Sequence, residues 1–190
     1  MKTVSKPFIF LFIFSSFSIN SQIPVGKWRD HFSYKEVHSI ADAGDIIYAA
    51  SELALFSFDK DEGSIEKLSK VNGLSDSGIE RIAYHKETES LMVVYNNANI
   101  DILSGNTVYQ LTELKREQIS SDKTIYDIYF YDNLAFLSCG FGIVVIDLER
   151  YEFKDTYFIG ENSSYVKVND ITIHENLIFA ATDEGLLQAD

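Results

Sequence analysis

Short apolar runs alternate with polar turns from residue 37 to the last residue, and this alternation dominates the chain. The runs contain Ile, Val, Leu, Phe and Tyr, and the residues between them are mostly Asn, Gly, Asp and Ser. Branched and aromatic residues favour strands, whereas small polar residues favour turns. The pattern therefore predicts many short strands, with LTELKREQIS (111–120) as the single candidate for a helical turn.

One strand–turn–strand unit recurs along the chain. Its copies begin 45, 43 and 43 residues apart, and an apolar-x-x-Ile pair precedes each. The copies are IIYAASELALFSFD (46–59), LMVVYNNANIDILS (91–104), LAFLSCGFGIVVID (134–147) and LIFAATDEGLLQAD (177–190). The preceding pairs are Val37 and Ile40, Ile79 and Ile82, Ile125 and Ile128, and Val168 and Ile171. A repeat of this length, with about four strands, is typical of a β-propeller blade.

The sequence therefore predicts an all-β protein, a partial β-propeller of about three and a half blades, each a four-stranded antiparallel sheet. The expected blades are residues 37–75, 76–122, 123–165 and 166–190, with the last cut after its second strong strand. Because propellers have roughly four to eight blades, we expect a fragment of a larger propeller, one of about seven blades.

Two positions of the repeat, compared across its four copies, predict local structure. The last loop position holds Ala54, Asn99, Gly142 or Gly185; Asn and Gly tolerate a positive φ there, whereas Ala54 predicts a different turn. The next position is expected to point into the core, and it holds Leu55, Ile100, Ile143 and Leu186.

The N-terminal region is different in character. Residues 1–21 are predicted to be a signal peptide, because Lys2 and Lys6 precede the apolar run 8–14 and small polar residues follow it. This run is shorter than the roughly 20 residues that cross a bilayer. We expect cleavage after Ser21, no membrane span after cleavage, and export. An uncleaved signal anchor is the alternative.

Residues 22–36 are predicted to form an N-terminal strand segment that closes a propeller ring by completing the last blade. Trp28 alternates with polar neighbours in this segment. We expect Trp28 to pack between blades, with stacking on a ligand as the alternative.

Charge and cysteine content narrow the classes of function. The formal charge is −13 and becomes −15 when the signal peptide, which carries two lysines, is removed. Such an acidic surface repels phosphate backbones, so we expect no nucleic-acid partner. The single cysteine, Cys139, excludes an intrachain disulfide and is expected to be a small buried hydrophobe, with a reactive thiol as the alternative.

Candidate chemistry is sparse. The histidines lie apart from one another and from Cys139, so a zinc site has little support; they are His31, His38, His85 and His174. The acidic run at 59–63 begins like a calcium loop, but Lys70 occupies the position that needs Glu, which indicates a charged turn; a weak calcium site is the alternative.

Other short motifs also fail. Asp30, His31 and Ser33 would point to opposite faces of a strand and cannot form a catalytic triad. CGFG (139–142) lacks the spacing of a phosphate-binding loop, and NSS (162–164) is interpreted as a loop. The sequence thus predicts no catalytic, cofactor-binding or metal site and no cofactor, and it leaves the binding residues unknown.

Resemblances to two known families indicate a function. The stretch VNGLSDSGIERIAY (71–84) and the DEGLL stretch with Gly185 and Leu186 resemble the two-component-regulator propeller repeat. The signal peptide, QIPVGKWRDHFSY (22–34), VNGLSDSGIERIAY and LSCGFGIVVIDLE together are similar to the N-terminal propeller of the PorZ family of the Bacteroidetes type IX secretion system.

The PorZ resemblance implies a non-enzymatic binding and assembly module in the periplasm or at the outer-membrane cell surface. It implies partnership with the sortase PorU and with PorV and PorQ, and handling of the anionic lipopolysaccharide to which cargo is attached. The sensor propeller of a hybrid two-component histidine kinase is one alternative. An exported carbohydrate-active propeller enzyme is the second.

Overall fold

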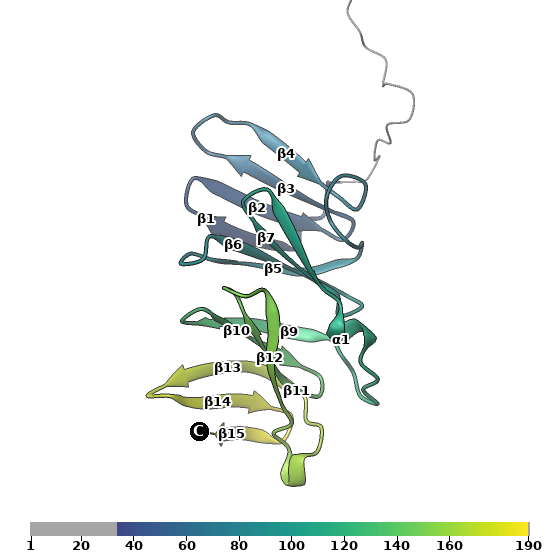
Figure 1. Cartoon of the computed structure of the whole chain (residues 1–190), viewed down its shortest axis with the longest axis vertical. Helices are drawn as coiled ribbons and strands as arrows, with labels where there is room; N and C mark the ends of the chain where they lie inside the picture. Colours follow the sequence, from purple (N-terminus) through teal and green to yellow (C-terminus); the bar gives the residue numbers. More distant parts are fainter. Residues whose placement is uncertain (1–33, 190) are drawn as a thin grey trace, which may run out of the picture.

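Four antiparallel β-sheets are stacked along the long axis of the molecule (Figure 1). The computed structural model describes residues 34–189. Sheet 1 is formed by β1 (Ser39–Ala43), β2 (Ile46–Ser51), β3 (Ala54–Asp59) and β4 (Ile65–Leu68). Sheet 2 is formed by β5 (Ile79–His85), β6 (Ser90–Tyr95), β7 (Ile100–Ser104) and β8 (Thr107–Leu111).

The second half of the chain repeats this arrangement. Sheet 3 is formed by β9 (Ile125–Tyr131), β10 (Leu134–Cys139), β11 (Gly142–Asp147) and β12 (Glu152–Tyr157). Sheet 4 is formed by β13 (Val168–His174), β14 (Leu177–Thr182) and β15 (Gly185–Ala189). Two short helical turns lie in connections, α1 (Glu113–Arg116) and η1 (Glu161–Ser163). α1 confirms the helical turn that the sequence predicts within 111–120.

Each sheet is a meander in which strands pair in chain order. The first strands of neighbouring sheets lie side by side, β1 with β5 and β9 with β13, and the connection after each last strand leads to the next sheet. Stacked meanders of this kind are propeller blades. The predicted all-β fold, its four repeated sheets and its period are therefore confirmed.

The core lies between the sheets in three apolar clusters, which we name the 1/2, 2/3 and 3/4 cores after the sheets that contribute to them. The 2/3 core is the largest and also takes Leu114 from α1. Side chains that alternate along a strand enter the cores on opposite faces. In β9, Ile128 and Phe130 pack into the 2/3 core, whereas Tyr129 and Tyr131 pack into the 3/4 core.

The predicted core column is confirmed in three repeats out of four. Leu55 and Ile100 are 0% exposed and Ile143 is 1% exposed, because each faces the next sheet. Leu186 is 73% exposed, contrary to the prediction. It lies on the outer face of sheet 4, which no described element covers.

The second repeat is out of register by one residue in its second strand. Ile40 pairs with Ala49 in sheet 1, whereas the equivalent Ile82 pairs with Val93 in sheet 2. β6 therefore aligns with β2 from residue 90, one residue earlier than the sequence comparison places it. The extra residue lies in the loop between β6 and β7.

Because of this inserted residue, the positive φ occurs at position 98 and not at position 99. Ala98 has φ +61° as the last residue of a three-residue loop, so the prediction for Asn99 is wrong. The predictions for Gly142 and Gly185 are confirmed, with φ values of +149° and +115°.

The N-terminal segment is described only from Tyr34 onward. Tyr34 lies edge-on against Phe56, with ring centroids 6.3 Å apart, and the ammonium of Lys67 lies 4.3 Å from its ring centre. Residues 34–36 are not in a strand. The predicted signal peptide and residues 22–33, with Trp28, lie outside the described residues.

Replacing Gly142 by alanine should lower the free energy of unfolding by about 3 kcal/mol or more. The new Cβ would overlap the backbone carbonyl oxygen of Tyr157 on β12, and the positive φ would be strained for alanine. Gly185→Ala is the matched control, because φ is also positive but nothing lies within 4 Å of the added atom. It should cost about 1 kcal/mol. Urea unfolding measures both, and equal losses would contradict the close approach at Gly142.

Candidate functional site

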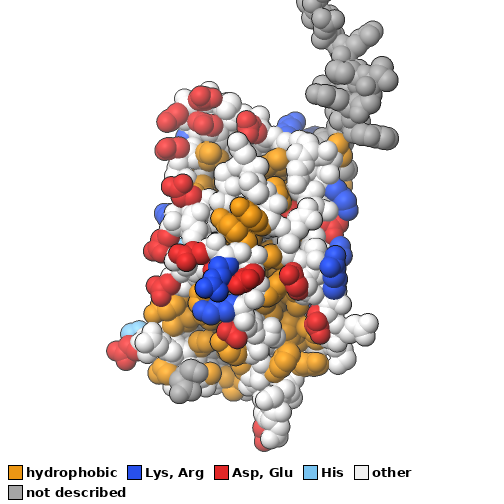
Figure 2. Space-filling view, viewed as in Figure 1, with side chains coloured by type: hydrophobic (Ala, Val, Ile, Leu, Met, Phe, Trp, Pro, Cys, Tyr) orange, Lys and Arg blue, Asp and Glu red, His pale blue; other side chains and the backbone are white. Residues whose placement is uncertain are grey.

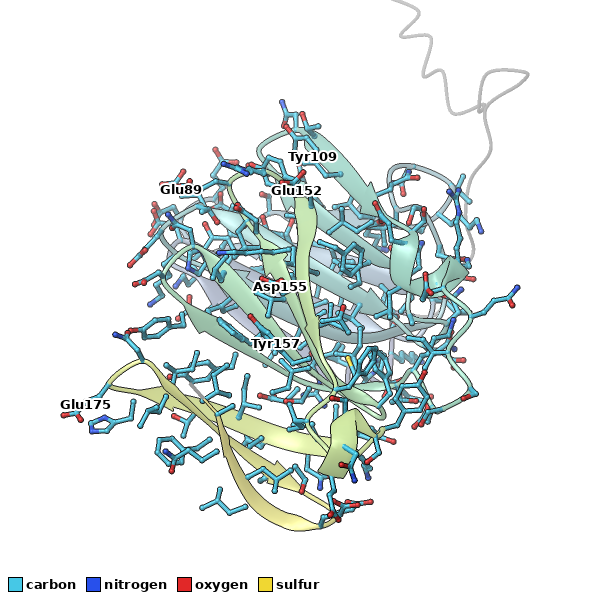
Figure 3. The ribbon with its side chains drawn as sticks, turned by 60° about the horizontal axis from the view of Figure 1, so that its bottom comes forward. Glu89, Tyr109, Glu152, Asp155, Tyr157 and Glu175 are labelled. Carbon is cyan, nitrogen blue, oxygen red and sulfur yellow. The ribbon has the colours of Figure 1, made fainter. Side chains whose placement is uncertain are left out.

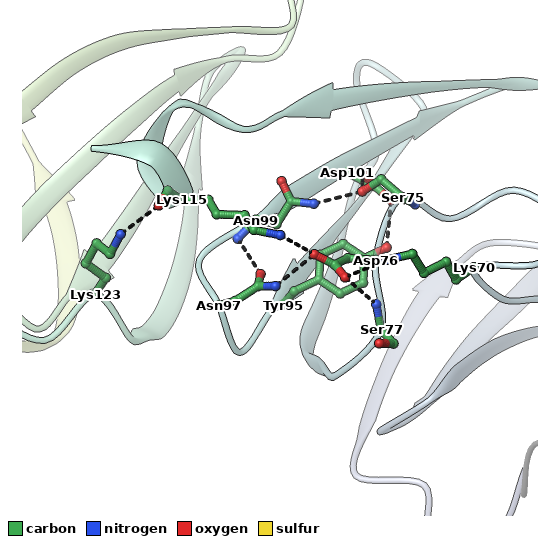
Figure 4. Close-up of polar contacts among 10 residues, drawn as sticks. All are labelled: Lys70, Ser75, Asp76, Ser77, Tyr95, Asn97, Asn99, Asp101, Lys115 and Lys123. Carbon is green, nitrogen blue, oxygen red and sulfur yellow. Dashed lines mark hydrogen bonds and ion pairs between the residues drawn. The ribbon is translucent and has the colours of Figure 1, made fainter. Parts of the chain in front are cut away.

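A polar cluster forms where the connection from sheet 1 to sheet 2 meets α1 and the loop between β6 and β7 (Figure 4). Asp76, in that connection, is at its centre. Its carboxylate accepts hydrogen bonds from Lys70 Nζ at 3.1 Å and Lys115 Nζ at 2.6 Å. It also accepts bonds from Asn97 Nδ2 at 2.8 Å and from the backbone N–H of Ser77 at 3.0 Å.

A second carboxylate, that of Asp101 on β7, lies behind the first and is 0% exposed. It accepts a hydrogen bond from the hydroxyl of Tyr95 at 2.6 Å and from the backbone N–H of Ser75 at 2.8 Å. The hydroxyl of Ser75 also donates to Asp101 and accepts a bond from Asn99 Nδ2 at 2.9 Å. Buried charge is tolerated here because its lone pairs are satisfied.

The environment shifts the pKa of two of these groups. Partial burial acts to raise the pKa of Asp76, but hydrogen bonds from Lys115, Asn97 and Lys70 outweigh it, so the pKa lies well below its usual range. Burial, together with the hydrogen bond to Asp101, raises the pKa of Tyr95 far above its usual value. Asp76 is therefore a permanent anion and Tyr95 a permanent hydrogen-bond donor at neutral pH.

The cluster ties elements together rather than activating a reactive group. An aspartate with so low a pKa is a poor general base. A separate lysine supports the same region, because Lys123 Nζ donates to the carbonyl oxygens of Leu114, Lys115 and Glu117 at 3.1, 2.9 and 3.2 Å. Lys123 thereby caps the end of α1 and helps to hold Lys115 over Asp76.

Two grooves are the other candidate features. The larger, of about 690 Å³, lies between sheets 3 and 4; in Figure 3, Asp155 and Tyr157 mark the part of β12 beside it. Its walls are mostly apolar and include Phe136, Ile143, Ile173, Ile178 and Leu187. The smaller groove, of about 310 Å³, lies beside α1 and is lined by residues that include Glu113, Glu117, Phe141, Phe158 and Tyr165.

The surface itself is acidic with apolar areas. In the face shown in Figure 2, acidic side chains follow one margin, and apolar side chains gather over the lower half, where sheets 3 and 4 lie. Exposed aromatic residues at the end of β12 include Tyr157 and Phe158, at 40% and 39% exposure. Such areas suit contact with another macromolecule.

The structure does not bring the described histidines together. His38 Nε2 lies 3.1 Å from the carbonyl oxygen of Ile79, which links sheet 1 to sheet 2. His85 is buried against the ring of Phe130, and His174 is exposed at the end of β13. Among the described residues, no group of three or more His, Cys, Asp or Glu side chains is placed to hold a metal ion.

The structure assigns structural roles to the cysteine, the acidic turn and the NSS sequence that the sequence analysis considered. Cys139 is 0% exposed, as expected for a small hydrophobe, and burial raises the pKa of its thiol to about 12. Asp59 accepts backbone hydrogen bonds from Asp61 and Glu62, each at 2.9 Å, within the turn from β3 to β4. The sequence 162–164 lies in a loop at η1.

Some candidates fall outside the described part of the chain. They are Asp30, His31 and Ser33, with Trp28. Within residues 34–189, no helix is both long and apolar enough to cross a membrane.

Sequence reasoning did not single out Asp76 and Asp101, although a signal was present. Asp101 occupies the column that holds Phe56, Val144 and Leu187 in the other repeats, by its pairing across the hairpin. An acidic residue in an apolar column indicates a buried polar network.

This geometry defines a partial β-propeller with apolar grooves and a polar cluster between its sheets. The sequence profile described as "TSS9, PorZ, N-terminal beta-propeller domain" matches residues 47–190. The chain therefore belongs to the family of PorZ N-terminal β-propeller domains.

Solved structures agree with this assignment. PorZ of Porphyromonas gingivalis, described as an essential bacterial surface component of the type IX secretion system, is 25% identical with a TM-score of 0.78. The match covers 86% of this chain and 22% of that one, so the chain spans about a fifth of the length of PorZ. A search of curated proteins finds no match to this chain.

Two more distant structures share the fold. The extracellular domain of a putative hybrid two-component system from B. thetaiotaomicron has 12% identity and a TM-score of 0.62, over 82% of this chain and 22% of that one. The computationally designed Ika4 protein has 11% identity and a TM-score of 0.60, over 84% of this chain and 93% of that one.

Replacing Asp76 by asparagine should lower the free energy of unfolding by about 1–3 kcal/mol at about pH 7, because the amide is neutral and has one acceptor oxygen, whereas the carboxylate pairs each of its oxygens with a lysine. The native pKa lies below that of an unfolded aspartate, about 3.9. The difference between the two proteins should therefore be complete above about pH 4 and shrink as pH falls toward the native pKa.

Urea unfolding at about pH 7 and about pH 3 measures this difference. Asp42→Asn is the control, because its ion pair with Lys60 is long, 3.8 Å, and exposed; its effect should stay below about 0.5 kcal/mol. A loss for Asp76→Asn no larger than this at about pH 7 would show that the cluster does not stabilise the sheets.

Proposed function

We propose that the chain is a non-enzymatic binding and assembly module of the type IX secretion system. The observation that carries this is the PorZ family match over residues 47–190, together with the superposition on PorZ at a TM-score of 0.78. Because the chain spans 22% of the length of PorZ, the proposal concerns the role of this domain and not that of every part of PorZ.

The arrangement of polar groups supports binding over chemistry. The two carboxylates of the polar cluster, those of Asp76 and Asp101, accept hydrogen bonds that hold the connection between sheets 1 and 2 in place. The accessible features are apolar grooves and exposed aromatic side chains. Surfaces of this composition bind other macromolecules through complementary shape.

We propose that the protein is exported and acts in the periplasm or at the outer-membrane surface, beside the sortase PorU and subunits such as PorV and PorQ. In this role it assists the attachment of cargo proteins to anionic lipopolysaccharide. The support is the PorZ family match, with the predicted signal peptide as the reason to expect export.

A second candidate is the sensor propeller of a hybrid two-component histidine kinase. It is supported by the likeness to the extracellular domain from B. thetaiotaomicron, at a TM-score of 0.62. That likeness has 12% identity and shows the fold alone, whereas the PorZ family match is one of sequence. We therefore favour the secretion role.

Affinity purification of the tagged chain from its native outer membrane should recover the sortase and leave kinase-linked proteins behind. An exported protein with the same tag and signal peptide but an unrelated fold is the control. Recovery of the chain only from the cytoplasm, or with a histidine kinase in place of the sortase, would reject the secretion role. Turnover of any substrate in a polysaccharide panel would reject the non-enzymatic assignment in favour of a carbohydrate-active enzyme.

A further inference from the structure

The smaller groove, which we name the α1 groove, lies between the connection that follows sheet 2 and the connection that follows sheet 3. Much of its surface is aromatic. Phe141 lines it at 0% exposure, and Phe158 and Tyr165 line it at 39% and 43% exposure. The ring centroids of Phe158 and Tyr165 are 5.3 Å apart and the rings are tilted by 58°. Two exposed rings that lie over a buried one give the groove an aromatic wall.

The connection that carries the two exposed rings is a closed turn. The backbone N–H of Gly160 donates to the carbonyl oxygen of Ser164 at 3.2 Å, and the N–H of Ser164 donates to the carbonyl oxygen of Glu161 at 3.2 Å. Phe158 and Tyr165 flank this turn and therefore lie side by side before any partner binds. A wall that is already in place lowers the entropic cost of binding.

The helical turn α1 adds acidic side chains to the groove. Glu113 is its first residue, and Glu117 follows its last residue, so the two lie one turn apart and both are exposed. Among the described residues that line the groove, the charged ones are Glu113 and Glu117. Arg116, on the same helical turn, does not line it.

The lysines near α1 are engaged elsewhere. Lys115 pairs with Asp76 at 2.6 Å, and Lys123 donates to three backbone carbonyl oxygens around the end of α1. In the part of the chain that the structure describes, no ion pair engages Glu113 or Glu117. Their carboxylates are therefore available to a cation from another molecule.

We propose that the α1 groove binds an arginine side chain on an extended segment of a partner protein. This inference rests on the proposed binding role and names the chemistry of one partner. A planar guanidinium stacks on aromatic rings and pairs with carboxylates, and the groove offers both kinds of group. Its volume of about 310 Å³ is at the lower end of the range for ligand sites, which suits about one or two side chains.

Charge favours a basic peptide over an anionic glycan or lipid headgroup. Glu113 and Glu117 would repel an anion, and the net charge of −13 adds repulsion at longer range. A purely apolar peptide would remove water from both carboxylates without replacing it by a partner, which costs free energy. A segment with arginine avoids both penalties.

Fluorescence anisotropy of a short labelled peptide, with one arginine between two leucines, should show binding to the purified chain. The same peptide with citrulline has the shape of arginine without its charge and should bind about tenfold more weakly or worse. The double variant Glu113→Gln, Glu117→Gln should weaken binding of the arginine peptide about tenfold and leave that of the citrulline peptide unchanged.

The matched control for this charge change is the double variant Glu87→Gln, Glu89→Gln. It also removes two negative charges, but from the turn between β5 and β6, which does not line the groove. Both peptides should bind it as they bind the original chain. All four glutamates are exposed, so circular dichroism should show that both double variants remain folded.

Tyr165→Ala should weaken binding of both peptides about fivefold, because the ring contacts the apolar stem that arginine and citrulline share. Nuclear magnetic resonance of the labelled chain should show that the arginine peptide shifts amide signals of residues 113–119 and 158–165.

Equal affinity for the arginine and citrulline peptides would overturn the proposal. So would no binding at about 1 mM chain, unchanged binding by the Glu113→Gln, Glu117→Gln variant, or amide shifts confined to another face. These outcomes are separate from recovery of the sortase. If the sortase is recovered while the arginine peptide does not bind, the α1 groove proposal fails and the secretion role stands.

Discussion

A four-stranded antiparallel sheet with apolar side chains on both faces is stable only where both faces are covered, and one sheet cannot do this for itself. Strand β9 shows the consequence, because its alternate residues serve two different cores. The position of each sheet is thus fixed by its neighbours. Burial of a leucine or isoleucine contributes about 2 kcal/mol, so a column such as Leu55, Ile100 and Ile143 is a large part of what holds the stack together.

The polar cluster satisfies hydrogen-bonding groups in a connection between two stacked sheets. Connections between sheets cross the end of the stack, where strand pairing no longer satisfies the backbone. In the connection between sheets 1 and 2, the carboxylates of Asp76 and Asp101 accept hydrogen bonds from backbone N–H groups. The side chains of Asp76 and Ser75 also bind side chains from the β6–β7 loop and α1. The dry cores fix the spacing of the sheets, and the hydrogen-bonded connection fixes their relative position.

Much of the fold was predictable, because strand and turn residues recur with one period and the same apolar columns return. The one-residue slip of β6 was not predictable, since both LMVV and SLMV alignments keep an apolar run and only the pairing of Ile82 with Val93 separates them. The cluster at Asp76 was also missed. Its partners are far apart in sequence, since Lys115 lies 39 residues from Asp76. Only Asp101, an acidic residue at an otherwise apolar position of the repeat, indicated a buried polar network.

Every described strand pairs only with the strand just before or just after it in the chain. Partners are therefore close in sequence, and the loop entropy that slows most all-β proteins is small for each hairpin. A chain with this topology can assemble one meander at a time, starting from whichever part is available first. The single cysteine of this sequence, Cys139, is buried, so no disulfide forms between two of these residues. Both properties allow the chain to fold progressively, as successive segments become available.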